Sequence, residues 1–225
     1  YQSASRNIPP SMSQKSSVSN QGDESYRVTS EWQCTAEKLL LTARAGHFNE
    51  VLTYDDSISA IHSKNKSRVT ILETEGKFRL TKMDMLTLAL NNTYVEAFAE
   101  GYVKNPHQSR FSLIGSYKIH SKKNTLNGFL NVRQELIQPD NHAIDTIIFT
   151  PFKTKQVLTK ASRPFTYSIG GEGYLFKYLS LNFSVAQHYR IPTFNDLYWA
   201  QGGNINLKPE SGWGEEVGLS FKHQY

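Results

Sequence analysis

The residues of this chain that could carry out chemistry do not form a catalytic or metal-binding set. Ser63 and Lys66 have the Ser-x-x-Lys spacing of a lysine-activated serine nucleophile, but no Ser-Asp-Asn or Lys-Thr-Gly motif accompanies them. The seven histidines show neither His-Glu-x-x-His nor a spacing of four residues, so a zinc site has no support. Asp55 and Asp56 lack the spaced carboxylates of a calcium loop. We therefore expect no catalytic residues, no metal and no cofactor.

Composition narrows the class of protein further. The single cysteine, Cys34, excludes an intrachain disulfide and a Cys-x-x-Cys site. The net charge of +5 is spread along the chain, and its nearest approach to a cluster is Lys64, Lys66 and Arg68 at an expected loop-to-strand junction. A nucleic-acid partner is not expected, because it would require many basic residues on one face. No apolar run approaches the ~20 residues that a membrane-spanning helix needs.

The elements that must position any functional side chain are β-strands. From residue 25 onward apolar and polar residues alternate with a period of two, as in 179–190, where Leu181, Phe183 and Val185 face one way and Asn182 and Ser184 the other. The 12 Tyr and 12 Phe also favour β structure. The pattern predicts about nine strands, at 26–34, 37–51, 68–80, 85–98, 110–120, 125–137, 165–174, 179–190 and 213–222.

The connections between these strands differ in length in a regular way. Short connections are expected at Thr81–Asp84, Ser121–Asn124 and Leu175–Tyr178, and long ones at Asp56–Ser67, Gln138–Pro164 and Thr193–Gly212. Because the two kinds alternate along the chain, an antiparallel meander would place all long loops at one end. Residues 1–24 are rich in Ser, Gln and Asn and are predicted to form a loop or extracellular segment, followed by one β domain over 25–225.

The alternation by itself fits both a soluble β-sandwich and a transmembrane β-barrel with its apolar face toward lipid. Three features favour the barrel. The strands approach the ~9–11 residues of a tilted spanning strand. Long and short connections fall at opposite ends. Aromatic residues, including Tyr117, Tyr174, Tyr189 and Trp213, lie near strand ends, where an interfacial girdle would place them.

The segment after residue 188 carries a more specific signal. Tyr189-Arg190-Ile191-Pro192-Thr193 followed by Phe194–Trp199 resembles the "FRAPT..ELY" segment of TonB-dependent outer-membrane receptors. Gly203–Glu210 followed by Glu215–Leu219 resembles the family's "GNPxLKPE…E.GL" signature, with Ile191 and Ile205 as departures from the usual Ala and Pro. The resemblance implies an all-β chain that forms part of a transmembrane antiparallel barrel of about 22 strands around a plug. The plug and the final strands would then lie outside this chain.

Two groups of residues in this segment are predicted to matter. The candidate ligand-binding residues are Arg190, Asn195, Asp196, Tyr198, Trp199, Gln201 and Asn204. The residues of the family motif, expected to be structural, are Pro192, Thr193, Leu197, Gly203, Leu207, Pro209 and Glu210. Each candidate also has a simpler interpretation, since aromatic residues pack in loops and Asn or Asp forms turns. We expect the segment to be ordered on the inner side of the barrel, with Arg190 close enough to Glu210 to pair.

The resemblance implies a receptor, not an enzyme, in the outer membrane of a Gram-negative bacterium. Such a receptor binds a large scarce nutrient at the cell surface and moves it into the periplasm. Its expected partners are the nutrient, outer-membrane lipid and the TonB complex, reached through the plug. The upstream residues Ser5-Arg6-Asn7-Ile8-Pro9-Pro10 look closest to cobalamin-receptor-like members. The alternatives are a ferric siderophore or haem receptor and, more distantly, a passive porin or an outer-membrane enzyme barrel.

Overall fold

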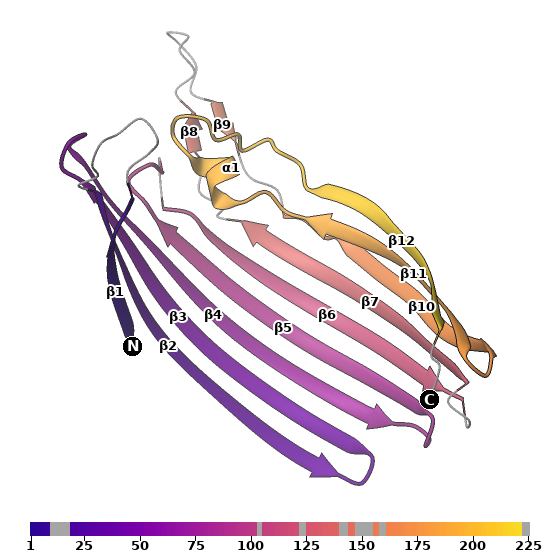
Figure 1. Cartoon of the computed structure of the whole chain (residues 1–225). Coiled ribbons are helices and arrows are strands. Elements are labelled where there is room, and N and C mark those ends of the chain that lie inside the picture. Colours follow the sequence, from indigo (N-terminus) through magenta and orange to yellow (C-terminus); the bar gives the residue numbers. More distant parts are fainter. Residues whose placement is uncertain are drawn as a thin grey trace.

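Most of the chain forms one curved antiparallel sheet in the computed structural model (Figure 1). The structure describes residues 1–9, 19–102, 105–121, 125–139, 144–146, 155–157 and 161–221. Its strands are β1 (Gln2–Asn7), β2 (Ser19–Ala36), β3 (Leu39–Asp56), β4 (Ile61–Arg79), β5 (Asp84–Phe98), β6 (His107–His120), β7 (Leu126–Pro139), β8 (Ile144–Thr146), β9 (Lys155–Val157), β10 (Phe165–Phe176), β11 (Leu179–Arg190) and β12 (Glu210–Phe221). One short helix, α1 (Phe194–Tyr198), lies between β11 and β12. No helix in the described residues is long and apolar enough to cross a membrane.

The sheet has ten strands in the order β1-β2-β3-β4-β5-β6-β7-β10-β11-β12, so each strand pairs with its neighbours along the chain. Strands β8 and β9 form a separate two-stranded hairpin within the β7–β10 connection. The predicted all-β meander is confirmed; β1 is added to the nine strands expected in the large sheet, and β8 and β9 were not expected. The sheet has two open edges, at β1 and β12, as a section cut from a larger barrel would have.

Two sequence predictions about loops are wrong. Residues 1–24 are not a continuous loop, because Gln2–Asn7 pair with Asn20–Ser25 at the start of β2. The long loop expected over Asp56–Ser67 is a tight hairpin, in which β4 already begins at Ile61 and pairs with Asp56. The Asp56 carboxylate accepts hydrogen bonds from the backbone N–H groups of Ile58 and Ser59 and so closes this turn. The polar composition suggested loops here, but backbone hydrogen bonds between strands form equally well where the side chains on both faces are polar.

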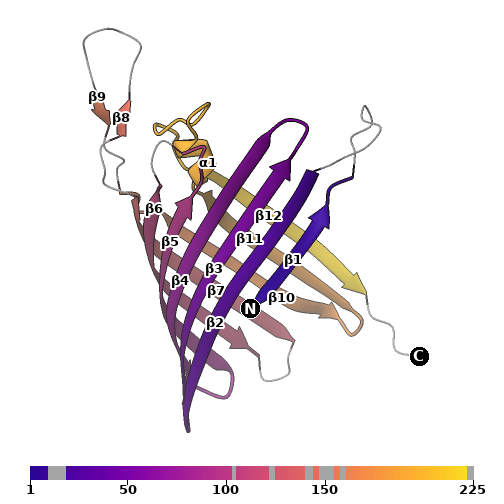
Figure 2. The same ribbon diagram turned by 90° about the vertical axis from the view of Figure 1, so that its left-hand side faces the viewer.

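The connections define two ends of the sheet, which we name the loop end and the turn end. At the turn end, β2–β3, β4–β5, β6–β7 and β10–β11 are joined by few residues, Lys177-Tyr178 in the last case. At the loop end lie the β5–β6, β7–β10 and β11–β12 connections together with α1 (Figures 1 and 2). The prediction that long and short connections lie at opposite ends is confirmed for these connections, but the β3–β4 hairpin at the loop end is short.

The register places the apolar residues of every strand on one face. Cross-strand partners such as Leu181 and Leu219, Ile169 and Leu130, or Leu113 and Leu90 continue this apolar face across the sheet. It is the exposed, convex face: Val217, Leu219 and Phe221 are 76%, 67% and 69% exposed. In the described residues the only buried hydrophobic side chains are Ile137, Leu197 and Tyr198. A soluble sandwich would bury its apolar face against a second layer, so the single layer seen here excludes the sandwich.

The opposite, concave face is polar and is connected by ion pairs across neighbouring strands. Arg44 on β3 contacts Glu31 on β2 and Glu73 on β4, both at 2.7 Å. On β6 and β7, Arg110 and Arg133 both contact Glu135, which is only 6% exposed. The buried polar residues of the described chain all lie on this face: Thr42, Gln108, Ser112, Glu135 and Ser180. An apolar outer wall with a charged inner wall is the arrangement of a transmembrane barrel.

Aromatic side chains border the apolar face at both ends. Near the loop end Tyr167 packs edge-on against Trp213 with ring centroids 5.4 Å apart. Near the turn end Tyr178 packs against Phe221 at 6.5 Å. These contacts join neighbouring strands into two belts, with Leu, Ile and Val between them, as interfacial girdles do.

Candidate functional site

The segment between β11 and β12 folds into a short capped helix followed by compact turns. Strand β11 ends before Pro192, which has no N–H to offer a further ladder bond. Thr193 is the N-cap of α1, and its hydroxyl accepts from the Asp196 N–H at 3.2 Å. The Asp196 carboxylate accepts in return from the Thr193 N–H at 2.8 Å, completing a capping box. The motif residues therefore fix how the chain turns inward from the wall.

Backbone contacts after the helix hold the following turn in place. The Gly203 N–H donates to the Trp199 carbonyl at 2.7 Å, and the Asn204 N–H donates to the Asp196 carbonyl at the same distance. A Cβ at Gly203 would lie 2.6 Å from both the N and the O of Trp199, so only glycine fits. None of the described glycines has a positive φ, so close approach of the backbone, and not a left-handed conformation, explains Gly203.

The capping box gives this segment a pH dependence. Hydrogen bonds from the Thr193 backbone and side chain, with a smaller effect of Arg190, lower the pKa of Asp196. Because the pKa is lower in the folded segment, the ionised carboxylate stabilises the fold. This contribution is complete above the ordinary Asp pKa of about 3.9 and is lost as the pH falls through the folded-state pKa. We expect the ¹⁹F signal of fluorinated Trp199, in the complete protein, to shift only below about pH 4. Asp196→Asn should abolish this step, and a step that persists in this variant would contradict the assignment.

The helix is docked onto the β5–β6 connection, which the sequence did not indicate. Trp199 forms an isolated β-bridge with Tyr102, and the two rings are perpendicular with centroids 5.9 Å apart. The Tyr102 hydroxyl donates to the Asn195 side-chain oxygen, and the Ala200 N–H donates to the Gly101 carbonyl at 2.8 Å. A Cβ at Gly101 would lie within 2.6 Å of three atoms of the Trp199 ring. In the sequence, the one sign of this contact was the Gly101-Tyr102 pair within the polar β5–β6 connection.

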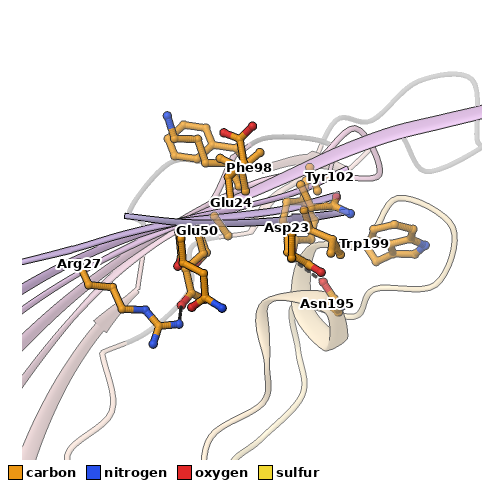
Figure 3. Close-up of a pocket in the computed structure, with 18 residues that line it drawn as sticks. Asp23, Glu24, Arg27, Glu50, Phe98, Tyr102, Asn195 and Trp199 are labelled. Carbon is orange, nitrogen blue, oxygen red and sulfur yellow. Dashed lines mark hydrogen bonds and ion pairs between the residues drawn. The ribbon is translucent and has the colours of Figure 1, made fainter. Parts of the chain in front are cut away.

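This docking closes one side of a cavity of about 670 Å³ at the loop end. Its lining includes Asp23, Arg27, Glu50, Tyr102, Asn195 and Trp199. Figure 3 shows Arg27 and Glu50 on the same side of the strands as Asn195, and Phe98 on the opposite side. Arg27 and Glu50 pair at 2.7 Å. The volume lies within the ~300–1,000 Å³ of small-molecule sites.

The structure separates the predicted ligand-binding residues into three groups. Asn195 and Trp199 line the large cavity. Arg190 and Asp196 line a smaller cavity of about 200 Å³ with Glu210, and Arg190 lies 3.6 Å from Glu210 as expected. Tyr198 is buried against Phe194 and offers no face to a ligand, while Gln201 and Asn204 lie in exposed turns. Of the other motif residues, Leu197 is buried, Leu207 is exposed, and Pro209 directly precedes β12.

A further cavity of about 340 Å³ lies beside the start of β10 and is rich in cations. Arg110, Arg133, Arg190 and His188 contribute to its lining, with Glu135 as its one carboxylate. Arg110 and Arg133 hold Glu135 between them, and Ser112 donates to Glu135 at 3.2 Å. The residues considered for calcium are already used within the fold, since Asp55 pairs with His62 and Asp56 caps its turn. Within the described ranges no cluster of acidic, His or Cys residues could hold a metal ion.

No family model matches the sequence. Solved structures show the fold instead. The copper transporter OprC superposes with a TM-score of 0.66 at 13% identity, over 91% of this chain and 37% of that chain. A double mutant of the Serratia marcescens hemophore receptor HasR, in complex with its hemophore HasA and heme, gives 0.66 at 14% identity, over 89% of this chain and 36% of that chain. Both are TonB-dependent receptors.

The fold is that of a TonB-dependent receptor barrel. This chain spans little more than a third of the length of those two barrels. Short stretches also match the vitamin B12 transporter BtuB of Photobacterium profundum, 46% identical over 46 residues, and that of Vibrio vulnificus, 48% identical over 42 residues. They cover 20% and 19% of this chain, and 8% and 7% of those proteins. All four proteins are named as transporters or receptors.

Proposed function

We propose that this TonB-dependent receptor barrel takes up a large scarce nutrient across the outer membrane of a Gram-negative bacterium, with a cobalamin-like molecule as the cargo. The observation that carries the proposal is the docking of the motif segment at the loop end, where Trp199, Tyr102 and Asn195 border the 670 Å³ cavity. Trp199 remains 38% exposed and offers part of its ring to a large planar ligand. The short matches to vitamin B12 transporters support the choice of cargo.

The charges around the cavity also support a cargo that is polar but close to neutral. On the concave side of its lining, Asp23 and Glu50 are paired with Arg6 and Arg27, at 3.6 Å and 2.7 Å. A strongly anionic cargo would find little net attraction here, whereas amide and hydroxyl groups would find donors and acceptors. The loop end would then face the outside of the cell.

The energy for release would come from the TonB complex, acting on a plug that fills the barrel. The curved sheet is consistent with this role because its concave wall is polar and its edges are open. In a complete barrel the wall must close, since each unpaired backbone group in lipid costs several kcal/mol. Uptake by this mechanism makes and breaks no bond in the cargo.

A receptor for an anionic cargo is the second candidate, and the 340 Å³ cavity favours it. Three arginines and His188 surround a single carboxylate there, which suits the acidic groups of haem or of a ferric siderophore. The site lies on the same inner wall, so cargo binding decides between the two candidates.

We expect the complete protein to bind cyanocobalamin with a Kd of about 10 nM or lower, and haem and ferric siderophores at least 100-fold more weakly. Parallel titrations in detergent measure this directly. Uptake of radiolabelled cobalamin should disappear in cells that lack TonB, and the protein should show no conductance in bilayers. Micromolar binding of cobalamin beside tight binding of haem or a siderophore would reject the preferred cargo, and TonB-independent conductance would reject the receptor.

A further inference from the structure

Although Lys66 borders the 670 Å³ cavity, the fold puts Lys64, Lys66 and Arg68 together on the face of Phe98, opposite the side of Arg27 and Asn195. They alternate along β4, and the register opposes Lys66 to Phe98 and Arg68 to Glu96 on β5. The next pair toward the turn end is Thr70 with Tyr94, and then Leu72 with Asn92 follows on the apolar face. The three cations therefore project from the convex wall and begin directly at the loop-end border of its apolar band.

Their height above the band corresponds to the headgroup layer of a membrane. Side chains two residues apart on a strand are ~7 Å apart along it, or ~5 Å in height for a strand tilted by about 40°. A headgroup layer is ~5–7 Å thick on each side of the hydrocarbon core. Arg68 and Lys66 thus lie at the level of headgroups, and the flexible Lys64 side chain can reach down to it.

The two lysines lack the carboxylate partner that five cations of the concave wall have. On the concave wall Arg27, Arg44, Lys77, Arg110 and Arg133 each contact a glutamate. In the part of the chain that the structure describes, no carboxylate lies within ion-pair distance of Lys64 or Lys66. Arg68 lies 3.6 Å from Glu96, and this contact leaves both side chains partly exposed.

The ring of Phe98 lies close to two of the three cations, Lys66 and Arg68. Phe98 lies on the same convex face, with its centroid 5.2 Å from the Arg68 guanidinium carbon and 6.0 Å from the Lys66 ammonium. Both distances are within the range of cation–π attraction. Three carboxylates share this face. Glu96 lies diagonally from Lys66 on β5, and Asp55, which pairs with His62, lies diagonally from Lys64 on β3, each ~7–8 Å away. Glu24 is separated from Lys66 by Val51 on β3, or ~10 Å across two strand spacings. At that distance salt screens most of its effect on an exposed lysine.

We propose that Lys64, Lys66 and Arg68 bind the phosphate group of a lipid in the leaflet at the loop end, beside its acyl chains on the apolar wall. Three neighbouring donors at headgroup height match a phosphate, and the apolar band below them matches the rest of the lipid. The site would anchor the wall at a fixed depth and recruit phosphorylated lipid around the receptor.

The test uses the complete protein reconstituted in phosphatidylcholine bilayers that contain spin-labelled phosphatidic acid. Electron spin resonance gives the relative association constant of phosphatidic acid for the protein surface. The double variant Lys64→Gln/Lys66→Gln should lower this constant by about fivefold for each lysine removed. Lys118→Gln removes one lysine charge from the concave wall and should leave the constant unchanged, where each lysine removed from the convex wall lowers it. Retained heat-modifiable gel mobility verifies that each variant is folded.

Three outcomes would overturn the proposal. An unchanged constant in the folded double variant would show that the lysines do not bind the lipid. An equal fall in Lys118→Gln would show that overall charge is responsible. Equal competition by inorganic phosphate, at ionic strength matched with chloride, would show a site for soluble anions and not for lipid.

Discussion

Leu90→Arg is expected to destabilise the complete barrel by about 2–4 kcal/mol, the cost of a cation at the bilayer midplane. Leu90 lies on the convex face between the two aromatic belts, opposite Leu113 on β6, and is 46% exposed. The guanidinium would face acyl chains with no carboxylate beside it on this face. Urea-induced unfolding in phospholipid vesicles measures the loss.

Two further variants identify the cause of that loss. Asn49 lies on the same face but at the loop end of the apolar band, opposite Arg68 and Tyr26. Asn49→Arg should lower the free energy of unfolding by less than about 1 kcal/mol. Leu90→Trp should fold normally and have its emission quenched by lipids brominated in their acyl chains. If Leu90→Trp were as destabilising as Leu90→Arg, the residue would be packed inside protein, and the lipid-facing assignment would be wrong.

Gly203→Ala is expected to lower the free energy of local opening of the motif segment by about 1–3 kcal/mol, as overpacking does in a tight site. The new methyl group would meet backbone atoms of Trp199 and Leu197, which cannot rotate away as a side chain can. Amide hydrogen exchange of residues 195–204 should accelerate by roughly 5- to 150-fold, and cargo affinity should fall because Asn195 and Trp199 lose their positions.

Gly202→Ala is the matched control for this substitution. A Cβ at Gly202 meets nothing within 4 Å, and the residue lies in the same turn. It should leave both hydrogen exchange and cargo binding close to their original values. Equal effects of the two variants would show that close backbone approach at Gly203 does not hold the segment in place.

The strand pattern was the most predictable part of this protein. Segments such as 179–190 alternate strictly because one face joins the exposed apolar band and the other joins the polar concave wall, and a one-residue slip would exchange them. The prediction was wrong where both faces are polar. The hairpin of β3 and β4 extends past the apolar band to Asp56 and Ile61, and β1 pairs with β2 although neither has an alternating apolar face there. Backbone hydrogen bonds sustain those segments without a hydrophobic signal.

The candidate site was predictable only within its own segment. Thr193 and Asp196 form a local capping box, and the Arg190–Glu210 pair follows from their positions at the facing ends of β11 and β12. The contact of Trp199 with Gly101 and Tyr102 could not be inferred, because it joins residues about a hundred positions apart. No local pattern encodes such a contact.

The sequence by itself determined the antiparallel strands, the face of each strand that is apolar and the family that the motif segment resembles, since these depend on neighbours along the chain. Only the tertiary structure decided that the apolar faces join into one exposed convex band, that Glu135 lies between two arginines, and that α1 closes a cavity against the β5–β6 connection. The physical reason is that curvature and long-range contacts arise when strands pair side by side. The free energy of that pairing depends on residues that are remote in the sequence.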